Sequence, residues 1–82
     1  MKLNTTYSMA EIDKVVEEEN LYEKVDGVLE PVSDNMPAGE IGEIVLPLYW
    51  EDGTVALNFI LVGYGTSSHW RCIYVCPRLD FI

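Results

Sequence analysis

The sequence predicts a single α+β domain, in which an N-terminal helix packs on a small antiparallel sheet of four or five strands built from hairpins. Three observations support this fold. Residues 8–20 carry apolar side chains at helical spacing. Two Asp-Gly pairs, at positions 26–27 and 52–53, each separate two strand-like runs, which is the strongest local signal for a β-hairpin. Residues 69–76 alternate in the manner of a last strand.

Residues 1–7 are expected to form a short lead-in, extended at 2–5, before the helix at 8–20. Ser8 and Glu11 have the spacing of a capping box, in which the serine hydroxyl and the glutamate carboxylate each accept from a free backbone N–H. Asn20 can end the helix in a left-handed conformation. The apolar stripe of the helix consists of Met9, Ile12, Val15 and Val16.

A weak hairpin is predicted over residues 21–33, with its turn at Asp26 and Gly27. Charged side chains interrupt both of its strands, and Pro31 cannot donate to a ladder. We therefore expect an edge hairpin or a ribbon that faces solvent.

The central hairpin is predicted over residues 41–62 and supplies most of the core. A two-residue turn places Leu48 opposite Leu57 and Trp50 opposite Val55. One face of this hairpin is then apolar: Ile44, Leu46, Leu48, Trp50, Val55, Leu57, Phe59 and Leu61. Pro47 conflicts with this register, because it falls at a position expected to donate, so a bulge or break is expected there. A three-residue turn remains the alternative.

In the last strand, at 69–76, one face carries Trp70, Cys72, Tyr74 and Cys76. Four residues apart on a strand, the two cysteine Cα atoms would be about 13 Å apart. A disulfide needs them within about 7 Å. The thiols are therefore expected to be free and to act as small apolar side chains.

The charge is strongly acidic and unevenly distributed. The chain has a net charge of −9; residues 1–43 hold eleven acids and three lysines, a net −8, and residues 44–82 hold the remaining −1. Such a field repels nucleic acid and anionic membranes and attracts basic partners. The start of the chain does not resemble a signal peptide, and no apolar run approaches the roughly 20 residues of a membrane span. A cytoplasmic protein is expected.

No stretch carries the pattern of an enzyme, a metal site or a cofactor site. His69 is the only histidine, and its neighbours Ser67 and Ser68 point to alternate sides of a strand, so no catalytic group assembles locally. The glycines at 63 and 65 precede a strand, whereas a phosphate loop precedes a helix. We expect a non-enzymatic protein with no cofactor and no metal.

The acids of the first half suggest a docking surface. Asp13 and Glu17 are one helical turn apart, about 6 Å, which is comparable to the ~7 Å between successive phosphates of a nucleic-acid strand. Amphipathic aromatic side chains that do not fit in a small core would add hydrophobic anchors. The predicted partner-binding residues are Asp13, Glu17, Glu18, Glu23, Asp26, Glu30, Tyr49, Tyr64 and Trp70.

The leading hypothesis is a small acidic binding module that docks on the basic surface of a larger protein. In size, acidity and fold style, the chain resembles the small acidic inhibitors that bacteriophages use against host defences, including anti-CRISPR and anti-restriction proteins. No motif carries this resemblance, so it assigns no residue a role. One alternative is a homo-oligomer, such as a homodimer, that uses an apolar sheet face. Another is a ligand- or metal-binding domain around His69 and Cys72.

Overall fold

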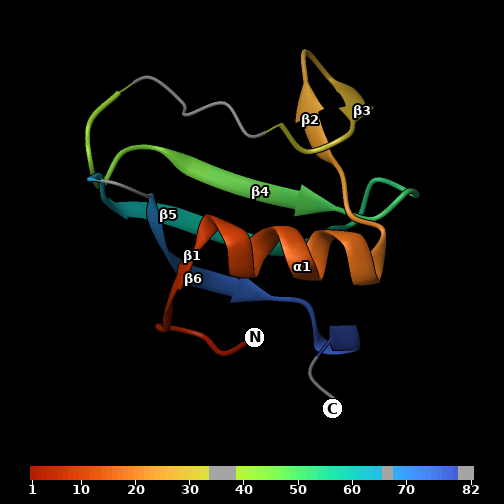
Figure 1. Cartoon of the computed structure of the whole chain (residues 1–82). Coiled ribbons are helices and arrows are strands. Elements are labelled where there is room, and N and C mark those ends of the chain that lie inside the picture. Colours follow the sequence, from red (N-terminus) through yellow and green to blue (C-terminus); the bar gives the residue numbers. More distant parts are fainter. Residues whose placement is uncertain (34–38, 66–67, 80–82) are drawn as a thin grey trace.

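The structure, a computed structural model, describes residues 1–33, 39–65 and 68–79, and it confirms the predicted α+β fold (Figure 1). A four-stranded antiparallel sheet has the order β1-β6-β5-β4, and a separate two-stranded ribbon pairs β2 with β3. The elements are β1 (Thr6–Ser8), α1 (Met9–Glu19), β2 (Glu23–Val25), β3 (Val28–Glu30), β4 (Val45–Tyr49), β5 (Val55–Gly63), β6 (His69–Val75) and the 3₁₀ turn η1 (Pro77–Leu79).

Helix α1 is capped at both ends as predicted. The Glu11 backbone N–H donates to the Ser8 hydroxyl (3.3 Å), and the Ser8 N–H donates to the Glu11 carboxylate (3.1 Å). Asn20 is left-handed (φ 53°) and ends the helix. Ser8 is also the last residue of β1, whose partner is β6, so the extended segment lies at 6–8 instead of the predicted 2–5.

The central hairpin has the predicted register in its middle, where Leu46 lies opposite Phe59 and Leu48 opposite Leu57. Its end differs. A bulge follows Leu48, so Tyr49 instead of Trp50 faces Val55. The predicted two-residue turn is wrong, and the three-residue alternative is the one observed: Glu51, Asp52 and Gly53 form the turn, which is closed by the Trp50 N–H donating to the Thr54 carbonyl (2.9 Å).

Pro47 lies opposite Asn58 as predicted, but the expected bulge at Pro47 is wrong. The Ile44 carbonyl accepts from β5, whereas the Tyr49 N–H and C=O both bond outward to Tyr22 at 2.7 Å. Since residues two apart on a strand direct their backbone groups to the same side, the Pro47 nitrogen lies on the outer edge with Tyr49. The hairpin therefore loses no ladder bond at Pro47.

The β2–β3 ribbon projects from the end of β4 (Figure 1). Asp26 (φ 51°) and Gly27 (φ 80°) form its turn, and positive φ at both central residues is typical of type I′. Val25 and Val28 are exposed, as expected for a ribbon facing solvent. Its isolated bridge to the sheet joins Tyr22 to Tyr49.

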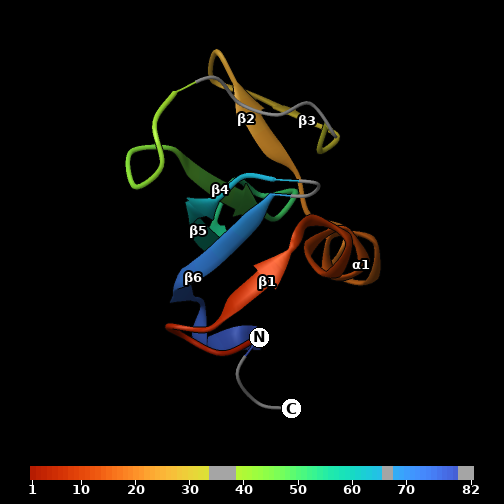
Figure 2. The same ribbon diagram turned by 60° about the vertical axis from the view of Figure 1, so that its left-hand side comes forward.

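The core lies between α1 and one face of the sheet, and no described helix or strand covers the opposite face (Figure 2). An irregularity between the Asn58 and Phe59 pairs leaves Ile73 without a partner on β5. This extra residue turns Tyr74 outward beside Asn58, so the prediction that Tyr74 shares a face with Cys72 is wrong. The buried core consists of Ile12, Leu21, Leu48, Ala56, Leu57, Phe59, Leu61, Trp70 and Cys72.

Within the described residues, no helix has the length and apolar character needed to cross a membrane.

Candidate partner-binding surface

The acids of α1 gather toward its C-terminal end. Glu17 and Glu18 are exposed, and Asp13 is half-buried one turn earlier. The last turn of the helix holds no basic residue. Since the C-terminal end of a helix carries partial negative charge, acids there destabilise it. The helix therefore presents negative charge at an unfavourable position.

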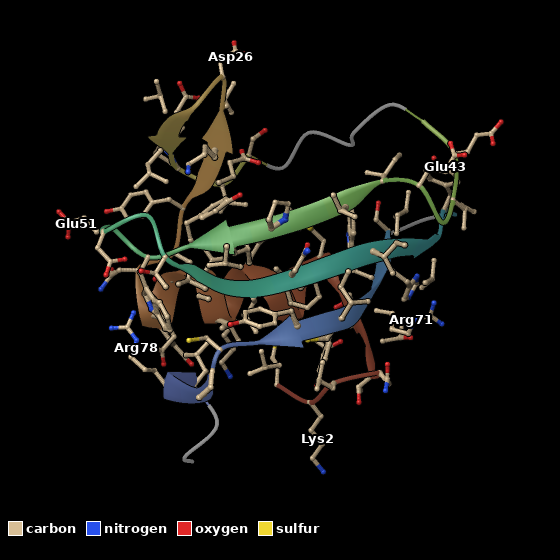
Figure 3. All side chains as sticks on the ribbon, turned by 180° about the vertical axis from the view of Figure 1, so that it is seen from behind. Lys2, Asp26, Glu43, Glu51, Arg71 and Arg78 are labelled. Atoms are coloured by element: carbon tan, nitrogen blue, oxygen red, sulfur yellow. The ribbon has the colours of Figure 1, made fainter. Side chains whose placement is uncertain are left out.

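The ribbon repeats this pattern. Glu23 and Glu30 are directly opposite each other across β2 and β3, an arrangement that is destabilising for like charges. The Glu23 carboxylate partly offsets it by accepting from the Ser33 N–H (2.7 Å). Asp26 projects from the tip of the ribbon (Figure 3).

Helix and ribbon are consecutive elements joined by residues 20–22, of which Leu21 is buried. Burial of Leu21 and the backbone bridge at Tyr22 hold the base of the ribbon beside the end of the helix. The structure thus brings six of the predicted acids onto two connected elements. We call them the acidic surface: Asp13, Glu17, Glu18, Glu23, Asp26 and Glu30.

The three predicted aromatic anchors do not gather. Tyr49 is half-buried at the edge of β4, with the Lys24 Nζ 4.7 Å from its ring centroid, and so lies beside the ribbon. Tyr64 is exposed but follows the far end of β5, where its hydroxyl donates to the Gly39 carbonyl. Trp70 is only 2% exposed, so its predicted surface position is wrong. It packs under α1 because the inward face of β6 is the core face.

The structure separates His69 from Cys72, the two residues of the predicted alternative ligand or metal site. Burial raises the pKa of the Cys72 thiol, which keeps it protonated and poorly nucleophilic at neutral pH. His69 is exposed whereas Cys72 is fully buried, three residues along the strand, so the two lie on opposite sides of β6. In the part of the chain that the structure describes, no three His, Cys, Asp or Glu residues converge as metal ligands.

Sequence reasoning missed a small cleft beside the acidic surface. It has a volume of about 170 Å³ and lies between the start of α1, the ribbon and the outer edge of β4. Four segments distant in sequence build it, so no local pattern signals it. Its described lining residues are Met9, Glu23, Lys24, Ser33, Val45, Leu46, Pro47 and Trp70.

Comparison with known proteins finds no matching protein-family model, no matching curated protein and no matching solved structure. A function must therefore be inferred from the charges, contacts and burial of this chain itself.

Proposed function

We propose that this protein is a non-enzymatic binding module that docks its acidic surface on a basic site of a larger protein. One observation carries the proposal: acids occupy positions where they weaken the elements that bear them. They crowd the end of α1, and Glu23 opposes Glu30 across the ribbon. Natural proteins depart from such local rules at functional sites and compensate for the cost elsewhere.

The basic site is proposed to be a groove that normally holds a nucleic-acid backbone. Acidic side chains at helical spacing can take the place of successive phosphates in such a groove, whereas the −9 chain itself repels nucleic acid. At class level, the protein would inhibit a host-defence or nucleic-acid-handling protein, in the manner of the phage inhibitors that it resembles.

The proposal is tested by biosensor binding against a panel of purified defence nucleases and other nucleic-acid-binding enzymes. We expect one of them to bind this protein and to release it when duplex DNA or guide RNA is added. If every enzyme with a basic groove fails to bind at micromolar concentration, the proposal is overturned.

A pair of triple variants then tests whether the acidic surface is the contact. Glu17→Lys, Glu18→Lys and Asp26→Lys together change the net charge from −9 to −3, and all three side chains are exposed. Association should slow and lose salt dependence, because electrostatic steering acts on the association rate. The matched control makes the same charge change at other exposed acids: Glu40→Lys, Glu43→Lys and Glu51→Lys. Figure 3 shows Glu43 and Glu51 at opposite ends of the central hairpin. Equal effects of the two triples would contradict a localised contact.

A second candidate function is self-association through the uncovered sheet face. This face exposes Val45 (51%), Ile73 (39%) and Tyr74 (42%), on strands β4 and β6. Two copies packed through it would keep their acidic helices apart, which limits charge repulsion. Sedimentation at tens of micromolar should then show a dimer that Ile73→Lys dissociates. A strict monomer would exclude this function.

A further inference from the structure

A second cleft lies beside the C-terminal half of α1. Its volume of about 140 Å³ is close to the roughly 150 Å³ of an engineered protein cavity that holds a benzene molecule. The cleft therefore has room for one long side chain. The helix, β5, η1 and the N-terminus all contribute to it, and its described lining residues are Met1, Val15, Glu18, Glu19, Leu57 and Leu79.

This cleft combines apolar and acidic side chains. Leu57 is buried, and Val15 and Leu79 are half-buried and pack against the core. Glu18 is exposed and Glu19 is half-buried. The i, i+3, i+4 spacing of Val15, Glu18 and Glu19 places all three on one face of the helix. A group that enters the cleft therefore meets apolar surface and carboxylates together.

The end of α1 adds to the negative charge at the cleft. The last carbonyls of a helix lack partners within it and carry partial negative charge, and the last turn of α1 holds no basic residue. Neither Glu18 nor Glu19 has an ion-pair partner in the described part of the chain, and the Met1 amino group pairs with neither of them. The charge of the cleft thus favours a cation.

A cation on an apolar stem matches both properties of the cleft. Long basic side chains cover apolar surface with their methylene groups while the charged head stays at the surface. Arginine fits better than lysine, because its planar guanidinium has enough N–H donors to bond two carboxylates at once, whereas the lysine ammonium is a compact, strongly hydrated charge. A groove that holds nucleic acid supplies such arginines, since they contact the phosphates.

We infer that this cleft receives an arginine side chain from the basic site of the partner. The arginine stem packs against Val15, Leu57 and Leu79, and its guanidinium bonds to Glu18 and Glu19. Glu18 belongs to the acidic surface, and the other residues extend that surface toward η1. The inference rests on the proposed docking function, for which it names one anchor of the partner.

The first test needs no partner protein. Nα-acetylarginine amide is titrated into the isotope-labelled full chain at low salt, and NMR follows the methyl signals of Val15, Leu57 and Leu79 and the amide signals of Glu18 and Glu19. These signals should shift and saturate. Nα-acetylcitrulline amide, which has nearly the same shape and no charge, should leave them in place. Nα-acetyllysine amide should bind at least about threefold more weakly than the arginine probe.

A double variant tests the two acids. Glu18→Gln with Glu19→Gln keeps the shape of both side chains and removes charge from the end of α1, where acids destabilise the helix, so the variant should fold. The arginine probe should bind it about threefold to tenfold more weakly, the effect of two partly exposed ion pairs. Glu40→Gln with Glu43→Gln is the matched control, which removes the same charge at exposed acids outside the cleft and should bind like the wild type.

Several outcomes would overturn the inference: signals that do not move or do not saturate, citrulline or lysine probes that bind as well as the arginine probe, or equal affinities of the two double variants. Its failure is distinguishable from failure of the docking function. An enzyme that binds the protein when the arginine probe does not would overturn the arginine cleft alone. Saturable binding of the probe when no enzyme binds would support the cleft and overturn the docking function alone.

Discussion

At the scale of single residues, the charge of Glu11 matters for the start of α1. The backbone N–H of Ser8, followed by its hydroxyl, holds the pKa of this carboxyl below its usual value of 4.5. A carboxyl with a lowered folded-state pKa contributes stability above its unfolded-state pKa, and this contribution disappears as the pH falls through the folded-state value. The capping box is therefore weakened in acid.

Replacing Glu11 with Gln should remove this part of the pH dependence. The wild-type protein is expected to melt at a higher temperature than Glu11→Gln near pH 7, and the difference should shrink as the pH falls below about 4.5. Circular dichroism melts from neutral pH down to about pH 2.5 measure it. Glu43→Gln, at an exposed loop acid, should keep the wild-type profile. A constant difference at all pH values would contradict the capping role.

For the candidate site, the elements that carry the acids were easier to predict than the directions of the strand side chains. The acids could be placed on helix and ribbon from the sequence, because capping and turn signals are local. Trp70 keeps the predicted face with Cys72, but the alternation alone could not show that this is the core face. The direction of Tyr74 could not be predicted. The single extra residue Ile73 reverses the alternation of β6 after Cys72, and only pairing with β5 reveals it.

At the scale of the elements, the two Asp-Gly hairpins differ in how firmly they join the fold. The ribbon is bridged to the sheet at one residue pair, whereas β5 pairs along both of its sides. Gly27 (φ 80°) and Gly53 (φ 87°) both need a left-handed backbone and have no atom nearby that would meet a methyl group. Strain introduced at either position is therefore conformational.

Alanine at these two glycines should affect stability unequally. Each substitution adds about 1–2 kcal/mol of local strain. Gly53→Ala should lower the melting temperature by about 4–16 °C, since each kcal/mol typically shifts it by about 4–8 °C in a domain of this size. Gly27→Ala should change it by less than half as much and should instead speed amide exchange within the ribbon. Equal melting temperatures for the two variants would show that the ribbon unfolds together with the sheet.

Pro47 protects the outer edge of β4, because a strand that lacks this donor is a poor template for another strand. Pro47→Val should restore the N–H and promote concentration-dependent association, measured by sedimentation. Pro31→Val, at an exposed position after β3, is the matched control and should remain like the wild type. If Pro47→Val sediments like the wild type, Pro47 does not protect the outer edge of β4 from association.

The elements themselves were predictable where their signals are local. The capping residues Ser8 and Asn20 predicted the bounds of α1, and the Asp26-Gly27 turn predicted the ribbon. Strand β1 lies further along the chain than the predicted extended segment because its partner is β6, with Thr6 opposite Arg71. No residue near β1 in the sequence indicates that pairing. The predicted pairing at the end of the central hairpin was wrong because a bulge adds one residue to a strand without changing the apolar pattern around it.

At the scale of the whole molecule, the net charge of −9 acts over a small body with a radius of gyration of 12.0 Å. At about 10 mM salt the screening length is ~30 Å, so every acid repels every other; at 150 mM it is ~8 Å. Salt should therefore stabilise the fold.

The melting temperature should rise between 10 mM and 150 mM NaCl. The Glu17→Lys, Glu18→Lys, Asp26→Lys triple variant should show a smaller rise, because it removes charge from the most crowded region. Differential scanning calorimetry at constant pH measures both. A melting temperature that is independent of salt would mean that repulsion among the acids does not limit stability.

The junction at Ser8 affects the order in which the elements of the chain can fold. Ser8 ends β1 opposite His69 and caps α1, with no linker between the two elements. On the ribosome, residues 69–71 are made long after the helix, so β1 has no partner while the helix emerges. The helix therefore gains its connection to the sheet through β1 only after β6 has emerged, although its apolar stripe can already pack on β4 and β5.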